Sequence, residues 1–375
     1  MKDLKIAFYL VFIASFLWSL IGLLLPLYLV DIGINGFQLG FLISLLSILG
    51  LLVAFPTGII NDKWSIRRAV SIAYVLLSVF FFGLSFFDSF SVLILFFILG
   101  GVGKEINKNS IRSFIYKIKT LKEGKKFGVF SCVEHIGMGL GLFVSALIIS
   151  FFNFNFMFLI TGVIFLFLIP FVYRFRPVQK YKIRLIQYPK EFFKKAKLLS
   201  LALFLFTLHW GAESTSYSLF LKNNLGLNVF WTAVYISIPL IIFGLFALKF
   251  GTVIDKKINF KFLFLLGLVV SGAGHILMTC PLVWLSFMFR ILHEIGDAMV
   301  EVAMLFWISK LFSFKTIGGE SGLIFTLAII GRFIGALIFA PIGFYWGYHY
   351  PFILSGVVIF ASAGLFCLLS QKKKI

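Results

Sequence analysis

Charged residues are scarce in this chain. Asp, Glu, Lys and Arg together make up 13% of its 375 residues, whereas 61% of the residues are hydrophobic. A soluble globular domain has about a quarter charged residues. A soluble fold of this length could not hide so much apolar surface from water. The composition therefore excludes a soluble protein and predicts that lipid covers most of the exterior.

Long segments of the chain contain no charged residue at all. They are residues 6–30, 32–61, 135–173, 223–248, 262–289 and 333–371. A membrane-spanning helix needs roughly 20 apolar residues, and barrel strands would alternate apolar with polar residues, which these runs do not. We predict an all-α membrane protein of about twelve spanning helices. The expected helices are near 5–30, 36–60, 68–87, 89–109, 127–151, 155–174, 198–221, 229–250, 261–280, 282–309, 318–344 and 350–370.

Motifs of catalysis and cofactor binding are missing. The three cysteines lie in apolar stretches without pairing or metal-ligand spacing. Gly103-Lys104 is not a phosphate-binding loop, because Ile98 and Glu105 stand where that motif needs other residues. No HExxH, GxSxG or CxxC motif occurs. We therefore expect no cofactor, no metal ion and no enzymatic activity, and no ATP-driven motor within this chain.

Basic residues follow a regular pattern along the chain. The even-numbered connections between the expected helices, together with the C-terminal tail, carry nearly all of the Lys and Arg outside the helices, and the odd-numbered connections carry only Lys222. Short cytoplasmic loops collect Lys and Arg, so we expect both termini in the cytoplasm and a multi-pass protein of a prokaryotic plasma membrane. The net charge of +20 is explained by this topology, with the lipid bilayer and not nucleic acid as the partner.

A polar stretch divides the chain into two similar parts. We predict an N-terminal six-helix bundle at 1–174, a basic cytoplasmic linker at 175–197 and a C-terminal six-helix bundle at 198–375. A constant offset of 193 residues relates Gly58 to Gly251 and Asp62 to Asp255. The same offset relates the Gly-x-Asn sequence at 33–35 to that at 226–228. Parallel six-helix repeats of this kind are one architecture of membrane transporters.

The segment from Gly58 to Arg68 resembles the loop motif of the major facilitator superfamily, which follows the second helix. Ser65 stands where the motif has its second glycine, and Ile66 where a basic residue is common. The resemblance implies a monomeric transporter of a small solute that works by alternating access. It implies close helix packing at Gly58 and a helix N-terminus facing Asp62, with Asp255 as the second copy. For Lys63, Arg67 and Arg68 it implies cytoplasmic charge networks, although inside-positive topology also explains these three residues.

Charges within the expected tenth helix lie on one face. Arg290, Glu294, Asp297 and Glu301 follow steps of four, three and four. Charged side chains in a bilayer are costly and default to functional candidates. At the offset of 193, Lys104 is opposite Asp297 and Lys108 opposite Glu301. These lysines either pair with the carboxylates in one transport state or extend toward the headgroups from the helix end.

The expected seventh helix carries His209, Glu213 and Tyr217 at steps of four, which places them on one face. Glu213 is either a proton-coupling carboxylate or the structural partner of Arg332, the one cation in the middle of the eleventh helix. Glu134 and His135 are weaker candidates, because the glycines that follow them indicate helix packing.

These residues favour a secondary active transporter, with a proton as the coupling ion and with import or export left open. One alternative is an integral-membrane enzyme acting on a lipid, which would need a metal or nucleophile cluster. The other is a non-transporting receptor or scaffold of the same fold.

The proposed pairing of Lys104 with Asp297 predicts charge-swap rescue. Lys104→Asp and Asp297→Lys should each lower transport, and the double variant should recover part of it, because the attraction is restored with the signs exchanged. Transport is compared at equal expression, and a double variant as inactive as the single variants would count against the pair.

Overall fold

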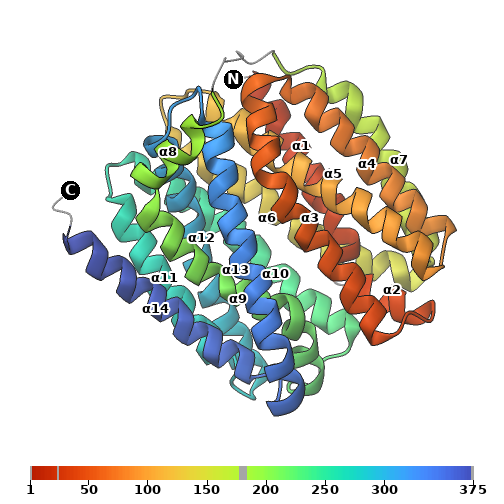
Figure 1. Cartoon of the computed structure of the whole chain (residues 1–375). Coiled ribbons are helices and arrows are strands. Elements are labelled where there is room, and N and C mark those ends of the chain that lie inside the picture. Colours follow the sequence, from red (N-terminus) through yellow and green to blue (C-terminus); the bar gives the residue numbers. More distant parts are fainter. Residues whose placement is uncertain (1, 23–24, 177–183, 373–375) are drawn as a thin grey trace. The chain divides into compact units, whose positions relative to one another are not determined.

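The structure is a computed structural model that describes residues 2–22, 25–176 and 184–372. Within these residues no strand occurs, and helices follow one another along the chain (Figure 1). Their bounds are α1 Lys2–Gly22, α2 Leu25–Asp31, α3 Gly36–Lys63, α4 Ile66–Phe86, α5 Phe90–Lys117, α6 Glu123–Phe151, α7 Phe154–Val172, α8 Gln187–Lys195, α9 Lys197–Asn223, α10 Val229–Asp255, α11 Phe260–Leu277, α12 Val283–Leu311, α13 Ile317–Trp346 and α14 Tyr350–Lys372. The all-α prediction is confirmed.

The helices differ from the predicted ones mainly at their ends. The predicted helix 5–30 is covered by α1 and α2, and residues 23 and 24 between them lie outside the described part of the chain. The end of α5 and the start of α6 extend past the predicted ends into charged sequence, because a helix continues beyond the apolar core of a bilayer at little cost. The predicted linker at 175–197 contains the helix α8, which was not predicted.

The two copies of the sequence repeat share the same local structure. Gly33 and Gly226 both have a positive φ, of 88° and 69°, which a glycine adopts without steric cost. Two residues later, Asn35 and Asn228 begin α3 and α10 as N-cap residues. Their side-chain oxygens accept hydrogen bonds from the third helical N–H at 3.0 and 2.9 Å. The offset of 193 residues therefore relates two copies of one loop.

Most of the helices have the length and apolar composition of membrane spans. Ten helices within the described residues qualify. The long helices α9 and α12 are not among them, and these two carry the polar and charged residues of the predicted site. Lipid-exposed helices tolerate few such residues, so the composition of α9 and α12 indicates helices with a protein-facing polar stripe.

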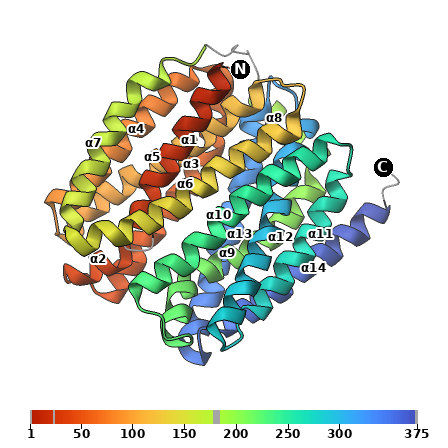
Figure 2. The same ribbon diagram turned by 180° about the vertical axis from the view of Figure 1, so that it is seen from behind.

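The chain forms two compact units that each combine separate segments. Unit 1 comprises residues 1–119, 141–192 and 312–326, and unit 2 comprises residues 120–140, 193–311 and 327–375. In unit 1, α4 packs against α5 and α7 (Figure 1). In unit 2, α11 packs against α12 and α14 (Figure 2). The division into bundles at 1–174 and 198–375 stays a prediction.

Glycines allow two helices of unit 2 to approach closely. A side chain at Gly251 would collide with the carbonyl oxygen of Gly124, and one at Gly124 would collide with that of Gly251. The same close approach occurs again one turn along, where a Cβ at Gly128 would lie 2.7 Å from the carbonyl oxygen of Ala247. Small residues at such crossings are the usual way in which membrane helices pack.

The Gly124–Gly251 crossing predicts that alanine is destabilising at Gly251 but not at a glycine outside a close helix contact. Gly251→Ala should lower the free energy of unfolding by about 1–3 kcal/mol, because the added methyl group overpacks the contact. Gly364→Ala is the matched control, since a Cβ there meets nothing within 4 Å. Thermal unfolding in detergent measures both variants, and equal melting temperatures would contradict the packing.

Candidate functional site

Helix α9 presents the predicted polar face toward the interior of unit 2. His209 and Tyr217 are buried, whereas the side chain of Glu213 retains 20% of its exposure. Gly211 lets α9 lie against α13, because a Cβ there would collide with the backbone of Gly335 and Ala336. The close packing holds this part of α9 rigidly, so the three side chains keep one common direction.

An arginine of α12 joins the two helices. Arg290 Nη1 donates to Glu213 Oε1 of α9, and Arg290 Nη2 donates to Glu294 Oε1 at 2.5 Å. The guanidinium also stacks over the Tyr217 ring, with its carbon 4.4 Å from the ring centre. Arg290 and Glu294 are each only 4% exposed. Buried ions need such partners, because removal from water costs several kcal/mol per ion.

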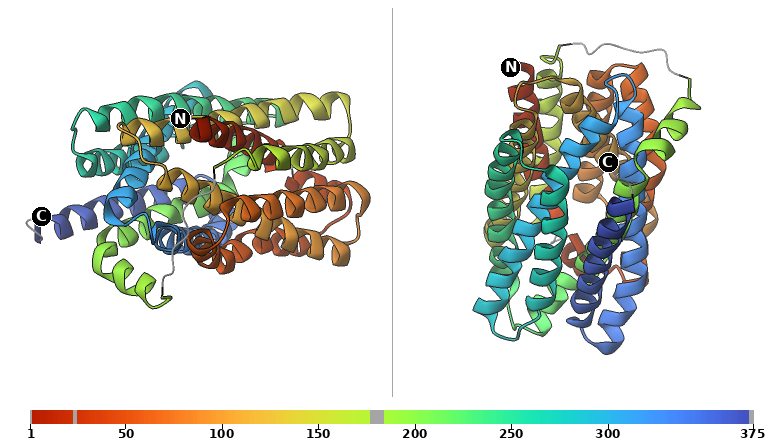
Figure 3. Two further views of the ribbon diagram at one scale, coloured as in Figure 1. Left: turned by 90° about the horizontal axis from the view of Figure 1, so that it is seen from above. Right: turned by 90° about the vertical axis from the view of Figure 1, so that its left-hand side faces the viewer.

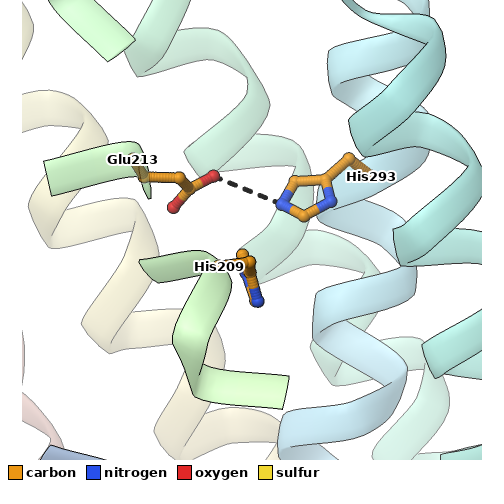
Figure 4. Close-up of side chains that lie close together, drawn as sticks. All are labelled: His209, Glu213 and His293. Atoms are coloured by element: carbon orange, nitrogen blue, oxygen red, sulfur yellow. Dashed lines mark ion pairs between the residues drawn. The ribbon is translucent and has the colours of Figure 1, made fainter. Parts of the chain in front are cut away.

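Two histidines complete the cluster from opposite helices (Figure 4). His293 Nε2 lies 3.3 Å from Glu213 Oε1 and 3.6 Å from Asp297 Oδ2. His209 Nε2 lies 3.3 Å from Asp297 Oδ2. Asp297 is also held by Ser271, whose hydroxyl donates to Oδ1 at 2.6 Å. We call Glu213, Arg290, Glu294, His293, Asp297 and His209 the α9–α12 relay.

The second nitrogen of each histidine ring determines its chemistry. His293 Nδ1 lies 2.9 Å from the backbone carbonyl oxygen of Ser271, and His209 Nδ1 contacts that of Phe206. A carbonyl oxygen only accepts, so both Nδ1 atoms carry hydrogen. Each Nε2 then directs a lone pair at carboxylate oxygens unless it binds a proton. A proton on either Nε2 would turn this repulsion into attraction.

The charge count of the relay leads to the same conclusion. Glu213, Glu294 and Asp297 carry three negative charges when ionised, against one positive charge on Arg290. Uncompensated charge is expensive in a low-dielectric interior. One or two protons on the histidines or the carboxylates bring the relay toward neutrality.

A metal ion is the other cation that this geometry could accept. His209, Glu213 and His293 each offer one ligand atom, and these atoms lie within 4.8 Å of one another. The imidazoles are oriented as in many zinc sites, with Nδ1 hydrogen-bonded to a backbone carbonyl. The guanidinium of Arg290, however, already bonds Oε1 of Glu213 and brings a positive charge to the place a metal ion would occupy. We therefore interpret the cluster as an ion-pair relay.

Glu301 belongs to a separate polar contact with α6. Ser131 donates its hydroxyl to Glu301 Oε1 at 2.6 Å, and His135 Nε2 lies 3.8 Å from Glu301 Oε2. The His135 ring stacks on Phe243, with ring centres 3.6 Å apart. Glu301 therefore shares its helix with the relay but pairs within unit 2 through another helix. Glu134 is half-buried on the neighbouring face of α6.

The two aspartates of the repeated motif lie at helix N-termini. Asp62 accepts hydrogen bonds from the backbone N–H groups of Gly318 and Gly319 at 3.1 and 2.8 Å, in the first turn of α13. Asp255 accepts those of Gly124 and Lys125, both at 2.8 Å, in the first turn of α6. A carboxylate is favoured there by the helix dipole and by unpaired N–H groups. A side chain at Gly58 would collide with the Gly318 carbonyl oxygen.

The other predicted residues are not among the six that define the relay. Lys104 places its ammonium over the Trp18 ring at 4.3 Å, and Lys108 is exposed, so their pairing with α12 stays a prediction. Glu213 pairs with Arg290, and Arg332 is exposed on α13. Within the described residues no ion pair involves Lys63, Arg67 or Arg68, and the charge networks implied for them also stay a prediction.

Sequence reasoning did not select the histidines of α11 and α12. His293 stands four residues before Asp297, and this helical spacing was a usable signal. His275 of α11 lies 4.5 Å from the His293 ring, centre to centre, and its Nε2 is 2.9 Å from the Ser355 hydroxyl. A single histidine in an apolar span gives no spacing signal, so His275 could be found only from the structure.

The fold is that of a multi-pass membrane protein, and comparison with known proteins identifies its family. The sequence profile of the Major Facilitator Superfamily matches residues 7–279. The chain belongs to this superfamily.

Two known proteins show how far the similarity extends. The quinolone resistance protein NorA of Staphylococcus aureus is 26% identical over 141 residues, which are 37% of this chain and 36% of NorA. The match thus spans about a third of the length of the curated relative. The crystal structure of the human organic anion transporter MFSD10 (TETRAN) superposes with a TM-score of 0.78 at 15% identity, covering 97% of this chain and 99% of that one. At this identity the superposition shows the fold alone.

The ion pair between Arg290 and Glu213 predicts that substitutions of these two residues are coupled in their effects on stability. Arg290→Gln should destabilise the protein by about 3–5 kcal/mol, because it leaves buried carboxylates unpaired. When Glu213→Gln is added to Arg290→Gln, it should lower the free energy of unfolding by less than it does in the unmodified protein. The difference between these two effects, the interaction energy, should be about 0.5–3 kcal/mol. Unfolding in detergent measures the stability of the unmodified protein, the two single variants and the double variant, which together form a double-mutant cycle. The control combines Glu213→Gln with Arg176→Gln, at an exposed side chain that pairs with Asp3. The losses of stability in this control should add. If the losses also add for Arg290→Gln and Glu213→Gln, the proposed coupling is contradicted.

Proposed function

We propose that this protein is a secondary active transporter that exports a small organic solute in exchange for protons. The observation that carries the proposal is the α9–α12 relay, where Arg290 pairs with Glu213 and Glu294 while the Nε2 atoms of His293 and His209 lie beside Glu213 and Asp297. A proton is the coupling ion that fits these groups, because each change of the ion pairs alters the number of bound protons.

We propose that Glu213 is the member of the relay that exchanges protons with solvent. Its side chain is 20% exposed, whereas those of Arg290 and Glu294 are 5% exposed. A proton that reaches Glu213 neutralises one partner of Arg290 and weakens the bond between α9 and α12. Loss of the proton restores the bond. The helices that carry the relay thereby acquire two arrangements that differ in protonation, as coupling to a proton gradient requires.

The direction of transport is proposed from the similarity to NorA. The printed name of that protein describes resistance to quinolones, which favours export of an organic molecule by this chain. The superposed human protein carries organic anions by its title, so both an aromatic drug and an organic anion belong in a substrate panel. We further propose a monomer in a prokaryotic plasma membrane with both termini in the cytoplasm, as the Lys and Arg distribution predicts.

Reconstitution into proteoliposomes tests this function. An imposed pH gradient should drive movement of at least one labelled solute from a panel of a fluoroquinolone, a cationic dye and an organic anion, with proton flow in the opposite direction. Glu213→Gln and Asp297→Asn should each lower proton-driven transport by roughly 100-fold, as loss of a proton-transfer group does in other proteins.

Asp31→Asn is the matched control, because Asp31 is an exposed carboxylate at the end of α2. It should transport like the unmodified protein. If no solute moves and no proton flux appears in proteoliposomes that contain folded protein, the proposed function is wrong. If transport occurs but is insensitive to the pH gradient and to Glu213→Gln, the proton coupling is wrong.

A further inference from the structure

The helix α8 lies in the segment that was predicted to be only a basic linker. Tyr188 and Phe192 are buried at a spacing of four residues, whereas Lys190 and Lys194 are exposed. This amphipathic pattern docks α8 on its neighbours by one face. Figure 3 shows the helix, coloured yellow-green, directly after the segment drawn in grey.

The ring of Tyr188 fits closely into unit 1. A Cβ at Gly319 would collide with this ring, so the ring lies directly on the first turn of α13. Phe55 of α3 meets the ring edge-on, with ring centres 6.2 Å apart and an angle of 82°. Tyr188 is 0% exposed. The side chain is therefore wedged between α3 and α13 rather than resting on a surface.

The hydroxyl of Tyr188 is directed at the carboxylate of Asp62, in the first copy of the repeated motif. It donates to Asp62 Oδ2 at 3.1 Å. Burial, and after it the charge of Asp62, raise the pKa of the Tyr188 hydroxyl far above its ordinary value. The hydroxyl therefore keeps its proton over the physiological pH range and serves as a permanent donor.

The two copies of the motif differ in their side-chain donors. Asp62 receives Lys117 Nζ at 2.8 Å and the Tyr188 hydroxyl in addition to two backbone N–H groups. Asp255 receives two backbone N–H groups and, among the described contacts, no side-chain donor. The Asp62 contact is thus the more strongly held of the two, and one of its additional donors comes from the connecting segment.

We infer that Tyr188 is a positioning residue that locks Asp62 onto the N-terminus of α13. The lock joins α3, from the segment 1–174, to α13, from the segment 198–375, and lies within unit 1. The inference rests on the proposed alternating access, in which these two segments must separate. The connecting segment then does more than tether the two parts of the chain. Its helix α8 sets how long they stay together at this end.

Tyr188→Phe isolates the hydroxyl from the ring. The ring contacts with Gly319 and Phe55 remain, and only the bond to Asp62 is lost. A hydrogen bond to a charged group is strong, so the population in which α3 and α13 are separated should rise about tenfold. Tyr173→Phe is the matched control, because Tyr173 is 54% exposed just after α7.

The separation is measured by pulsed electron paramagnetic resonance on the full-length protein. The three native cysteines are replaced by serine, and spin labels are attached through Trp64→Cys and Ser313→Cys, at exposed positions beside the ends of α3 and α13. The labelled protein with Tyr188 unchanged and the labelled Tyr173→Phe variant should give mainly the short distance between the two labels. Tyr188→Phe should give a clearly larger long-distance fraction.

The distance distribution is recorded without solute and without a pH gradient, so its result does not depend on whether transport is proton-coupled. An unchanged distribution in Tyr188→Phe would overturn the lock. A lower melting temperature of Tyr188→Phe with an unchanged distribution would also overturn it, because a merely structural tyrosine affects stability alone. A larger long-distance fraction supports the lock even if the solute panel fails in proteoliposomes.

Discussion

An ionised carboxylate that is buried in a membrane protein must be surrounded by donors, and this requirement shapes both polar regions of the molecule. Glu213 and Glu294 obtain donors from Arg290, and Asp297 obtains one from Ser271. The Nε2 atoms of His209 and His293 lie beside Asp297 and Glu213. Asp62 obtains them from a helix N-terminus, a lysine and a tyrosine. Because apolar helices supply no spare donors, each carboxylate defines which other helix must lie beside it.

The two regions answer this requirement in different ways. The donors to Asp62 are backbone N–H groups, an ammonium and a tyrosine hydroxyl, and none of them loses its proton readily near neutral pH. The α9–α12 relay instead includes the imidazoles of His209 and His293, a side-chain type that can both donate and accept a proton. The region at Asp62 is therefore suited to hold one arrangement of α3 and α13. In the proposed function, the relay exchanges protons while the region at Asp62 holds the two helices together.

The fold was largely predictable, because apolar runs and Lys and Arg positions report directly on the bilayer. The motif at Asp62 and Asp255 was visible in its repeated spacing, and the two aspartates do lie at helix N-termini. The partner of Glu213 was not predictable. Arg290 and Arg332 are both available in the sequence, and only the three-dimensional structure, in which Arg290 pairs with Glu213, decides between them. The nine-residue α8 was hidden in a basic stretch, where its two buried aromatic residues give too short a pattern to recognise.

The proton-accepting role of the relay is tested most directly by infrared difference spectroscopy of the purified protein in lipid. Acidification from alkaline to mildly acidic buffer should produce the ring band of a protonated imidazole, and this band should be weakened in Glu213→Gln, which removes the carboxylate beside His293, and kept in Asp31→Asn. A Glu213→Gln spectrum that is identical to that of the unmodified protein would contradict the role of Glu213 in the relay.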